Sequence, residues 1–257
     1  EMFIEGLENK SLFQDENGHY KDVADWDGVT TDSNGKIEII QWMDDRRSIF
    51  PFAGTLHFEY LPETVLAFFA GFTPFEGAIC LPLLPRKLVL FCVYSARLSG
   101  TLEVEALPDT VTTIDLGQNE CHGTVDLTHL PPNMNHLSLR MNNFEGAVDL
   151  GHLPDSLEHI DLSHNKFSGS IDLSSIPRAC VQLCLEENCF SGNVRIENVP
   201  TGMRRISVFK NMFEGDVFIS DIPREFELLI IDENINVRNM SGEIVSGPRI
   251  RCWSEKV

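Results

Sequence analysis

Eight prolines recur along the chain at a fixed interval of 23 residues. They are Pro62, Pro85, Pro108, Pro131, Pro154, Pro177, Pro200 and Pro223. A fixed period of this length is typical of repeat architectures, in which each unit packs only on its neighbours. The chain is therefore predicted to form an elongated solenoid of about eight or nine repeats, with a core that runs along its whole length.

One frame of apolar positions surrounds each proline. Its clearest copy reads Leu157-x-x-Ile160-x-Leu162-x-x-Asn165-x-Phe167-x-Gly169-x-Ile171-x-Leu173-x-x-Ile176-Pro177. The alternation at Ile160 and Leu162 predicts a short, half-buried strand in every repeat. Stacked strands would form a parallel sheet and bury one column of apolar side chains, with Leu137, Ile160, Leu183 and Ile206 among its members.

Two further columns of the frame predict structural roles. Asparagines occupy the position where the chain leaves the strand, and their amides can satisfy backbone groups of the turn: Asn119, Asn142, Asn165, Asn188, Asn211 and Asn234. Aromatic side chains follow two residues later and predict a buried spine: Phe75, Phe144, Phe167, Phe190 and Phe213, with Leu98 and Cys121 in the same slot. Both columns are interpreted as parts of the fold and not as catalytic sets.

The outer side of each repeat is too short for a helix. With 23 residues per repeat, the segment after the glycine has room only for a second short strand or a turn. The predicted fold is thus a β-rich solenoid with a parallel concave sheet and with short strands or turns instead of helices on the convex side.

This frame resembles the leucine-rich repeat. The F-x-G-x-I segment of each unit and the stretch Trp26-x-Gly28-Val29-x-Thr31 resemble the plant-type subfamily, whose amino-terminal cap reads W-x-G-V-x-C. Thr31 stands where the secreted relatives carry a disulfide-bonded cysteine. The Asp-Leu-x-x-Leu-Pro segments between repeats also resemble arrays found in single-celled eukaryotes. The resemblance implies a curved leucine-rich-repeat solenoid that binds other proteins.

Caps are expected at both ends of the array. Residues 1–36 are predicted to form an amino-terminal cap, residues 37–237 the solenoid, and residues 238–257 a carboxyl-terminal cap. The first repeat is irregular, so a loop from Asp44 to Phe50 is expected to bulge out. A lid is expected over Leu228 and Ile230 at the other end.

The charge balance excludes two classes of partner. The chain has 39 acidic and 20 basic residues, which gives a formal net charge of −19. This charge would repel nucleic acid and anionic lipid. We therefore expect protein partners and no nucleic acid. Membrane insertion is not expected either, because no apolar run reaches the roughly 18 residues that a membrane span needs.

The cysteines favour a reducing compartment. There are seven, an odd number, and none precedes Cys80, so no disulfide can close the amino-terminal cap. Two glycosylation sequons begin at Asn9 and Asn239, close to the number expected by chance. An intracellular location, cytoplasmic or organellar, is expected, with a secreted or surface location as the alternative.

Apolar side chains gather on the concave positions of two amino-terminal repeats. They are Phe69, Phe72, Leu90, Cys92 and Tyr94. A contiguous exposed apolar patch is typical of a partner-binding surface, although the amino-terminal cap or the loop near Asp44 could instead cover it. The complete set of candidate partner-binding residues is Phe69, Phe72, Leu90, Tyr94, Arg140, Arg205 and Phe209.

Other polar columns have structural interpretations. Glu103, Asp126, Asp149 and Asp172 form an acidic column that is interpreted as solvated surface. Arg205 and Lys210 are expected to pair with Glu186 and Glu187. Pairs of histidines at His136 and His159, and at His129 and His152, raise the alternative of a metal site, but no closed set of four ligands accompanies them.

No catalytic motif is recognised in the sequence, and no cofactor or metal is expected. A phosphate-binding glycine loop, a nucleophile elbow and a distinct carboxylate pair are all lacking. The predicted function is a non-catalytic scaffold for protein interactions or an accessory subunit of an intracellular assembly. The alternative is a secreted or cell-surface recognition ectodomain.

Overall fold

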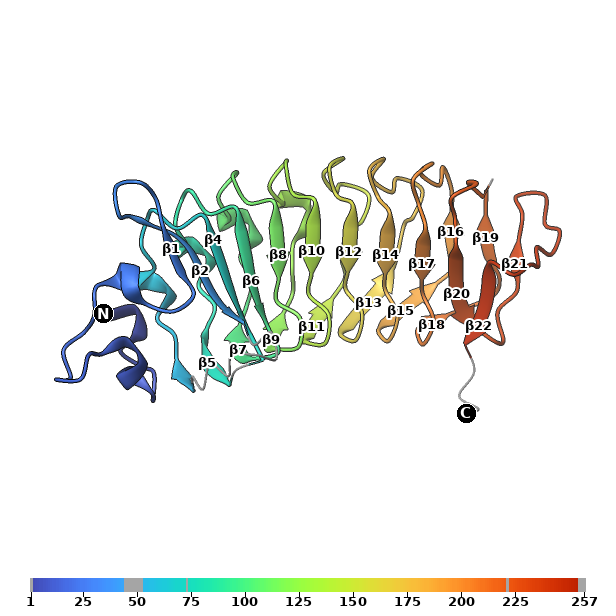
Figure 1. Cartoon of the computed structure of the whole chain (residues 1–257). Coiled ribbons are helices and arrows are strands. Elements are labelled where there is room, and N and C mark those ends of the chain that lie inside the picture. Colours follow the sequence, from blue (N-terminus) through green and yellow to red (C-terminus); the bar gives the residue numbers. More distant parts are fainter. Residues whose placement is uncertain (1, 44–52, 73, 221, 254–257) are drawn as a thin grey trace.

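The protein is a single extended coil in the computed structural model, which describes residues 2–43, 53–72, 74–220 and 222–253. Successive turns of the chain lie side by side, and the two ends of the chain lie at opposite ends of the coil (Figure 1). The loop predicted between Asp44 and Phe50 falls outside the described residues.

An 11-stranded sheet forms one long side of the coil (Figure 1). Its strands, in spatial order, are β1 (Val29–Thr31), β2 (Ile37–Met43), β4 (Ala67–Gly71), β6 (Leu90–Tyr94), β8 (Thr113–Asp115), β10 (His136–Ser138), β12 (His159–Asp161), β14 (Gln182–Cys184), β17 (Arg205–Ser207), β20 (Leu228–Asp232) and β22 (Ile250–Trp253). All neighbours pair in parallel except β1, which pairs antiparallel to β2. The predicted parallel sheet is confirmed.

Register in this sheet follows the 23-residue period without slippage in the middle repeats. Leu137 lies opposite Ile160, Ile160 opposite Leu183, and Leu183 opposite Ile206. All four side chains are buried, because they project from the strands toward the interior of the coil. Since strand side chains alternate between faces, the flanking residues of each strand are left on the concave surface.

The remaining sides of the coil contain short strands and 3-10 turns. An eight-stranded sheet consists of β18 (Met212–Phe213), β15 (Cys189–Gly192), β13 (Lys166–Ser170), β11 (Asn143–Gly146), β9 (Glu120–Gly123), β7 (Arg97–Gly100), β5 (Phe75–Ala78) and β3 (Gly54–Thr55). A three-stranded sheet consists of β16 (Arg195–Ile196), β19 (Val217–Ile219) and β21 (Val237–Arg238). The turns are η4 (Phe58–Tyr60), η5 (Leu81–Leu83), η6 (Val104–Ala106) and η7 (Leu127–His129).

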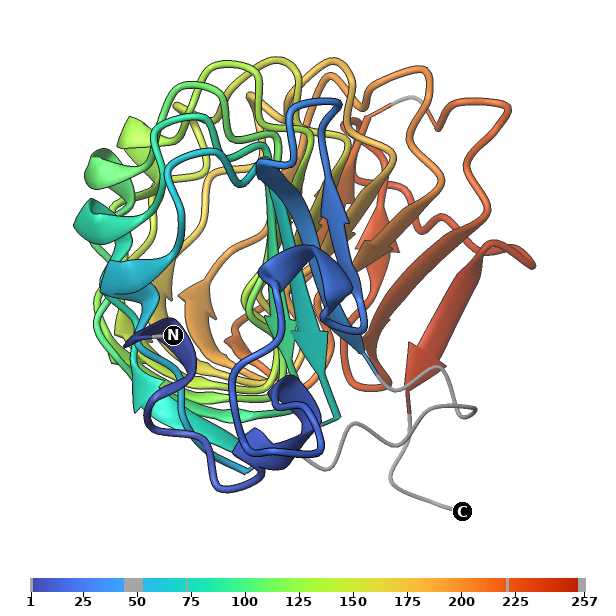
Figure 2. The ribbon, with the colours of Figure 1, turned by 60° about the vertical axis from the view of Figure 1, so that its left-hand side comes forward.

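Figure 2 looks obliquely along the coil and places these turns on the side opposite the large sheet. The 3-10 turns occur in the amino-terminal repeats, whereas β16, β19 and β21 replace them toward the other end. The prediction of short strands or turns in place of helices on the convex side is therefore confirmed.

The amino-terminal segment covers the first open end of the core. It contains η1 (Met2–Ile4), η2 (Lys10–Phe13) and η3 (Val23–Asp25), followed by β1. The rings of Phe3 and Phe13 pack on the buried indole of Trp42, with centroids 5.6 and 5.7 Å apart. These aromatic contacts remove from water the apolar face that a first repeat would otherwise expose.

The carboxyl-terminal segment extends the large sheet by one strand. Strand β22 pairs with β20 over Leu229 to Asp232 and so covers the sheet edge. Leu228 and Ile230 stay half-buried, because β22 lies beside them in the sheet and not over the concave face as a lid.

An asparagine ladder runs through the interior beside the aromatic spine. The amide nitrogen of Asn165 donates to the carbonyls of Leu139, Leu162 and Ser163 at 2.9, 3.2 and 3.1 Å. Its amide oxygen accepts the backbone N–H of Phe144 at 3.1 Å. Each asparagine therefore joins two adjacent turns of the coil, and the interior backbone groups find partners without water.

The ladder repeats at Asn119, Asn142, Asn188 and Asn211. The expectation that Asn234 continues it is wrong, since Asn234 lies exposed in a turn. Its repeat is followed by β21 and the terminal segment, so the chain leaves the frame at this point.

Asn165→Ala is expected to lower the free energy of unfolding by about 3 kcal/mol, because four buried backbone groups lose their partner at once. Chemical denaturation measures this change. Asn143→Ala is the matched control, because Asn143 is exposed, and it should change stability by less than about 0.5 kcal/mol. Equal effects of the two substitutions would contradict the ladder.

Candidate functional site

The apolar patch lies on the concave face of β4 and β6. Phe69 is opposite Cys92 across these strands, and Leu90 and Tyr94 stand at the two ends of β6. A depression of about 300 Å³ opens between Gln41, Phe69, Cys92, Tyr94 and Asp115. The predicted patch is thus a hollow with an aromatic wall and one carboxylate at its margin.

Tyr94 is held in this hollow by a neighbouring glycine. A methyl group added to Gly71 would lie 2.9 Å from Cε1 of Tyr94, so the ring rests directly on the Gly71 backbone. The ring of Phe72 meets it edge-on, with centroids 4.8 Å apart. Burial is the largest of the influences that raise the pKa of the Tyr94 hydroxyl, and the nearby Asp115 carboxylate adds to it.

Phe72 adopts a conformation that is unfavourable for a bulky residue. Its φ is 57°, in the left-handed region, and its side chain is 56% exposed. The same repeat position is left-handed in six later turns, where Ser95, Gln118, Met141, His164, Glu187 and Lys210 occupy it, so the conformation belongs to the repeat frame. The left-handed conformation raises the free energy of a residue that carries a Cβ by roughly 1–2 kcal/mol. Because the phenyl ring of Phe72 is exposed, its packing offsets little of this cost.

The described part of the amino-terminal cap does not cover the patch. Phe3 and Phe13 pack on Trp42, and Phe3 also meets Phe68, both on the core side of the sheet. All residues that line the depression belong to strands β2, β4, β6 and β8. Within residues 2–43, the cap therefore covers the end of the core and leaves the concave patch open.

The middle of the concave face is polar. The carboxylates of Asp115 and Asp161 each accept a hydrogen bond from the backbone N–H of the residue two positions later, at 3.0 Å in both cases. The rings of His136 on β10 and His159 on β12 lie next to each other, with their centroids 5.7 Å apart. Burial lowers the pKa of His136, with its neighbour His159 acting in the same direction, although Asp115 and Asp161 oppose the shift.

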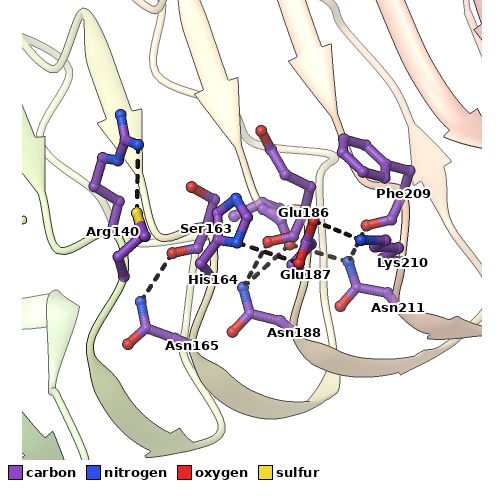
Figure 3. Close-up of polar contacts among 12 residues, drawn as sticks. Arg140, Ser163, His164, Asn165, Glu186, Glu187, Asn188, Phe209, Lys210 and Asn211 are labelled. Atoms are coloured by element: carbon purple, nitrogen blue, oxygen red, sulfur yellow. Dashed lines mark hydrogen bonds and ion pairs between the residues drawn. The ribbon is translucent and has the colours of Figure 1, made fainter. Parts of the chain in front are cut away.

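Arg140 stands apart from the other basic residues of this face. Its side chain is exposed, and Nη2 donates to Sδ of Met141 at 3.5 Å (Figure 3). Its aliphatic stem lies over Gly117, where an added methyl group would meet Cγ of Arg140 at 2.9 Å. The structure thus brings Arg140 near the margin of Asp115 and not into the apolar patch.

Ion pairs link three adjacent turns at the carboxyl-terminal end of this face (Figure 3). Glu187 accepts from Nζ of Lys210 at 2.8 Å and lies 3.2 Å from Nδ1 of His164. Lys210 also lies 4.4 Å from the ring centroid of Trp253, and Phe209 stacks on that indole at 5.3 Å. The expected local ion-pair cluster is confirmed, and Phe209 packs on β22, at the opposite end of the coil from the apolar patch.

The buried Glu186 and the half-exposed Arg205 form an ion pair with poor geometry. Oε1 of Glu186 lies 3.6 Å from Nη2 of Arg205, beyond a good hydrogen bond. Among the described residues, Oε2 of Glu186, Nε of Arg205 and Oγ of Ser207 are buried without a hydrogen-bond partner. Burial is the main reason that the pKa of Glu186 is raised, and Arg205 opposes this only weakly.

The acidic column on the convex side lies at the exposed surface, as expected, and three of its members also hold the turns that follow them. The carboxylates of Asp126, Asp149 and Asp172 accept the backbone N–H of the residue two positions on, at distances between 2.8 and 3.0 Å. Asp126 and Asp149 also pair with His129 and His152 at 2.9 and 2.7 Å. These side chains stabilise the turns, as the spacing Asp-Leu-Thr, Asp-Leu-Gly and Asp-Leu-Ser could have indicated.

Metal chemistry finds no support in the described ranges. No group of three or more histidine, cysteine or acidic side chains there is arranged to hold an ion. No described helix is long and apolar enough to span a membrane.

Glu186→Gln is expected to raise the free energy of unfolding at neutral pH by about 1 kcal/mol, the scale of one unsatisfied buried polar group. The raised pKa of Glu186 means that the native state binds this proton more tightly than the unfolded chain. The penalty is absent at low pH, grows as pH rises past the unfolded pKa of about 4.3, and is complete above the folded pKa. Denaturation curves between pH 3.5 and 7.5 measure the difference.

Glu187→Gln is the matched control, because the half-exposed Glu187 forms favourable ion pairs. It should lower stability at neutral pH by less than about 1 kcal/mol. A stabilising effect of Glu186→Gln that is the same at pH 3.5 and at pH 7.5 would contradict the assigned penalty.

The cysteines are expected to react in two classes. Burial raises the pKa of Cys92, Cys121, Cys180 and Cys184 to about 12 in each case, so their thiolates are scarce at neutral pH. Cys189 and Cys252 are exposed. Alkylation followed by peptide mapping should label Cys189 and Cys252 first and the three buried thiols, Cys121, Cys180 and Cys184, only on unfolding. Rapid labelling of Cys121 or Cys180 in the native protein would contradict the burial.

No protein-family model and no curated protein sequence matches the chain. Solved structures match its fold. One is the leucine-rich-repeat ectodomain of the plant membrane receptor kinase GASSHO1/SCHENGEN3 from Arabidopsis thaliana in complex with CASPARIAN STRIP INTEGRITY FACTOR 2, with a TM-score of 0.61 and 18% identity. The match covers 84% of this chain and only 26% of that receptor chain.

A plant ice-binding protein is similar to the same extent. Its TM-score is 0.60 at 17% identity, and the match covers 92% of this chain and 84% of that one. At these identities the likeness concerns the course of the backbone, which agrees with the repeat frame and with the parallel sheet. The chain has the leucine-rich-repeat fold that its sequence predicts.

Proposed function

We propose that this chain is a non-catalytic protein-binding module that docks a partner on its concave face through the patch Phe69, Phe72, Leu90 and Tyr94. The observation that carries the proposal is the strained and exposed Phe72 beside Tyr94. The repeat frame makes this position left-handed in seven turns and accepts residues such as Ser95 and Lys210 there, so the fold does not require an exposed phenyl ring. Phe72 therefore fits a surface that is completed by a partner.

The patch has the anatomy of an interaction hot spot. It combines a hollow of about 300 Å³ with the aromatic rings of Phe69 and Tyr94 at its wall. Tyrosine contributes a large apolar area together with a hydroxyl group, and such anchors carry much of the binding energy in protein interfaces. Arg205 and Phe209 take part in contacts within the chain, so we give them a supporting role at most.

Two compartments remain candidates for this module. The fold likeness to a receptor ectodomain supports a secreted or cell-surface recognition role. The seven cysteines, all unpaired, and Thr31 at the cap position support the intracellular subunit that we expected from the sequence. Peptide mapping of native material separates them, because disulfides, or glycan on Asn9 or Asn239, would establish the ectodomain role.

Tyr94→Ala is expected to weaken partner association by more than about 1 kcal/mol, or at least fivefold, because it removes the central anchor of the patch. The immobilised wild-type chain and the variant are compared by capture from source cells with quantitative mass spectrometry. The captured partner is then purified for a measurement of the dissociation constant.

Tyr60→Ala is the matched control, because Tyr60 is 45% exposed on η4, outside the strands that form the concave sheet. It should leave association unchanged. Thermal unfolding of both variants should stay close to that of the wild type. Loss of stability in Tyr94→Ala without loss of binding would indicate a structural role for the ring, and no change in either quantity would remove the patch from the interface.

A further inference from the structure

One column of the concave sheet places an aromatic ring and two carboxylates at equal intervals. The sheet register aligns Phe69, Cys92, Asp115, Ser138 and Asp161 on five successive strands. Neighbouring strands lie about 4.8 Å apart. Phe69 and Asp115 are therefore separated by about 9.6 Å across the strands, and so are Asp115 and Asp161.

Both carboxylates are fixed in position before any ligand arrives. Oδ1 of Asp115 accepts the backbone N–H of Gly117, and Oδ1 of Asp161 accepts both the N–H and the hydroxyl of Ser163, the latter at 2.5 Å. Both aspartates are half-buried in a chain whose net charge is −19. Within the described ranges, neither carboxylate has a basic side chain at ion-pair distance. The column therefore offers two oriented acceptors for positive charge.

We propose that this column binds a segment of a partner protein in the polyproline II conformation, with an apolar side chain followed by basic side chains three and six residues later. The inference rests on the proposed protein-binding function and specifies the chemistry of its ligand. The apolar side chain packs on the ring of Phe69, at the end of the hollow away from Asp115. The two basic side chains donate to Asp115 and Asp161.

The spacing selects this backbone conformation. A polyproline II helix has three residues per turn and a rise of about 3.1 Å, so every third side chain returns to one face after about 9.3 Å. In a β-strand, side chains on one face recur at about 6.8 Å and then at about 13.6 Å, neither of which matches the column. The strand spacing of the protein thus agrees with the ligand period to within a few tenths of an ångström at each step.

Arg140 allows a second, independent test of the proposed binding mode. Its stem lies over Gly117, and an added methyl group at Gly117 would meet both Cγ of Arg140 at 2.9 Å and Oδ1 of Asp115 at 3.2 Å. The stem of Arg140 therefore passes close to Asp115, while its guanidinium donates to Sδ of Met141. The positive charge of Arg140 on this face opposes a cationic ligand. Removal of that charge should strengthen the binding of a basic segment and weaken the binding of an acidic one.

The test uses a labelled peptide, acetyl-Leu-Pro-Pro-Arg-Pro-Pro-Arg-amide, with fluorescence anisotropy against the intact chain. A second peptide carries citrulline in place of both arginines, which removes the charge and keeps the shape. We expect the citrulline peptide to bind at least fivefold more weakly. Asp115→Asn and Asp161→Asn should each weaken the arginine peptide at least threefold, and Arg140→Gln should strengthen it at least twofold.

Asp155→Asn is the matched control, because it removes the same charge from an exposed turn outside the column. It should leave binding within twofold of the wild type. Any of four results would overturn the inference. The two peptides could bind equally, or Asp155→Asn could weaken binding as much as Asp115→Asn and Asp161→Asn do. Arg140→Gln could weaken binding, or the arginine peptide could fail to bind at 1 mM.

Tyr94→Ala separates this inference from the proposed function. If it weakens both peptides equally while arginine and citrulline bind alike, the apolar docking patch stands and the recognition of basic side chains falls. If Tyr94→Ala leaves both peptides unchanged, the inference falls because the apolar step is not made at the patch. The proposed function is then tested separately, by comparing how much partner the wild-type chain and Tyr94→Ala capture.

Discussion

The hydrogen bonds of the asparagine ladder are the interaction on which the rest of the structure depends. A turn of 23 residues must bring its backbone through the interior at the point where the strand ends, and buried amide and carbonyl groups need partners there. Each ladder asparagine supplies three donated bonds and one accepted bond between two turns, as Asn165 does. The strand that precedes it is thereby fixed in register with its neighbour.

Fixed register turns a linear sequence into a surface with columns. Residues that are 23 positions apart become neighbours about one strand spacing apart, as His136 and His159 do. The frame positions are occupied by the core and by the ladder, so the residues between them are free to vary without a penalty in folding. The concave face consequently changes from aromatic at Phe69 and Tyr94 to polar at Asp115 and Asp161, and to an ion-pair cluster around Glu187, along one continuous sheet.

The sequence predicts most of this fold because period and frame determine which side chains face inward. It also places Phe69 and Tyr94 on the concave face. It does not predict that Tyr94 leans over Gly71 or that Phe209 stacks on Trp253, because the first depends on a rotamer and the second on a residue outside the repeat frame. The roles of Asp126 and Asp149 were missed although their turn signature was visible, since the column was interpreted by its charge alone. Asn234 fits the frame in sequence and fails in structure, because the chain departs from the coil after it.

The constant register between β8 and β12 has a consequence for how such an array acquires new specificity. Insertion of one complete repeat between these strands would preserve every ladder contact, because each contact joins only adjacent turns. The same insertion would move Asp161 farther from Asp115 by one step of about 4.8 Å. The distance between two contact residues on the concave face can therefore change only in steps of one strand spacing. Each step alters the length of ligand that fits and leaves the contacts within the scaffold unchanged.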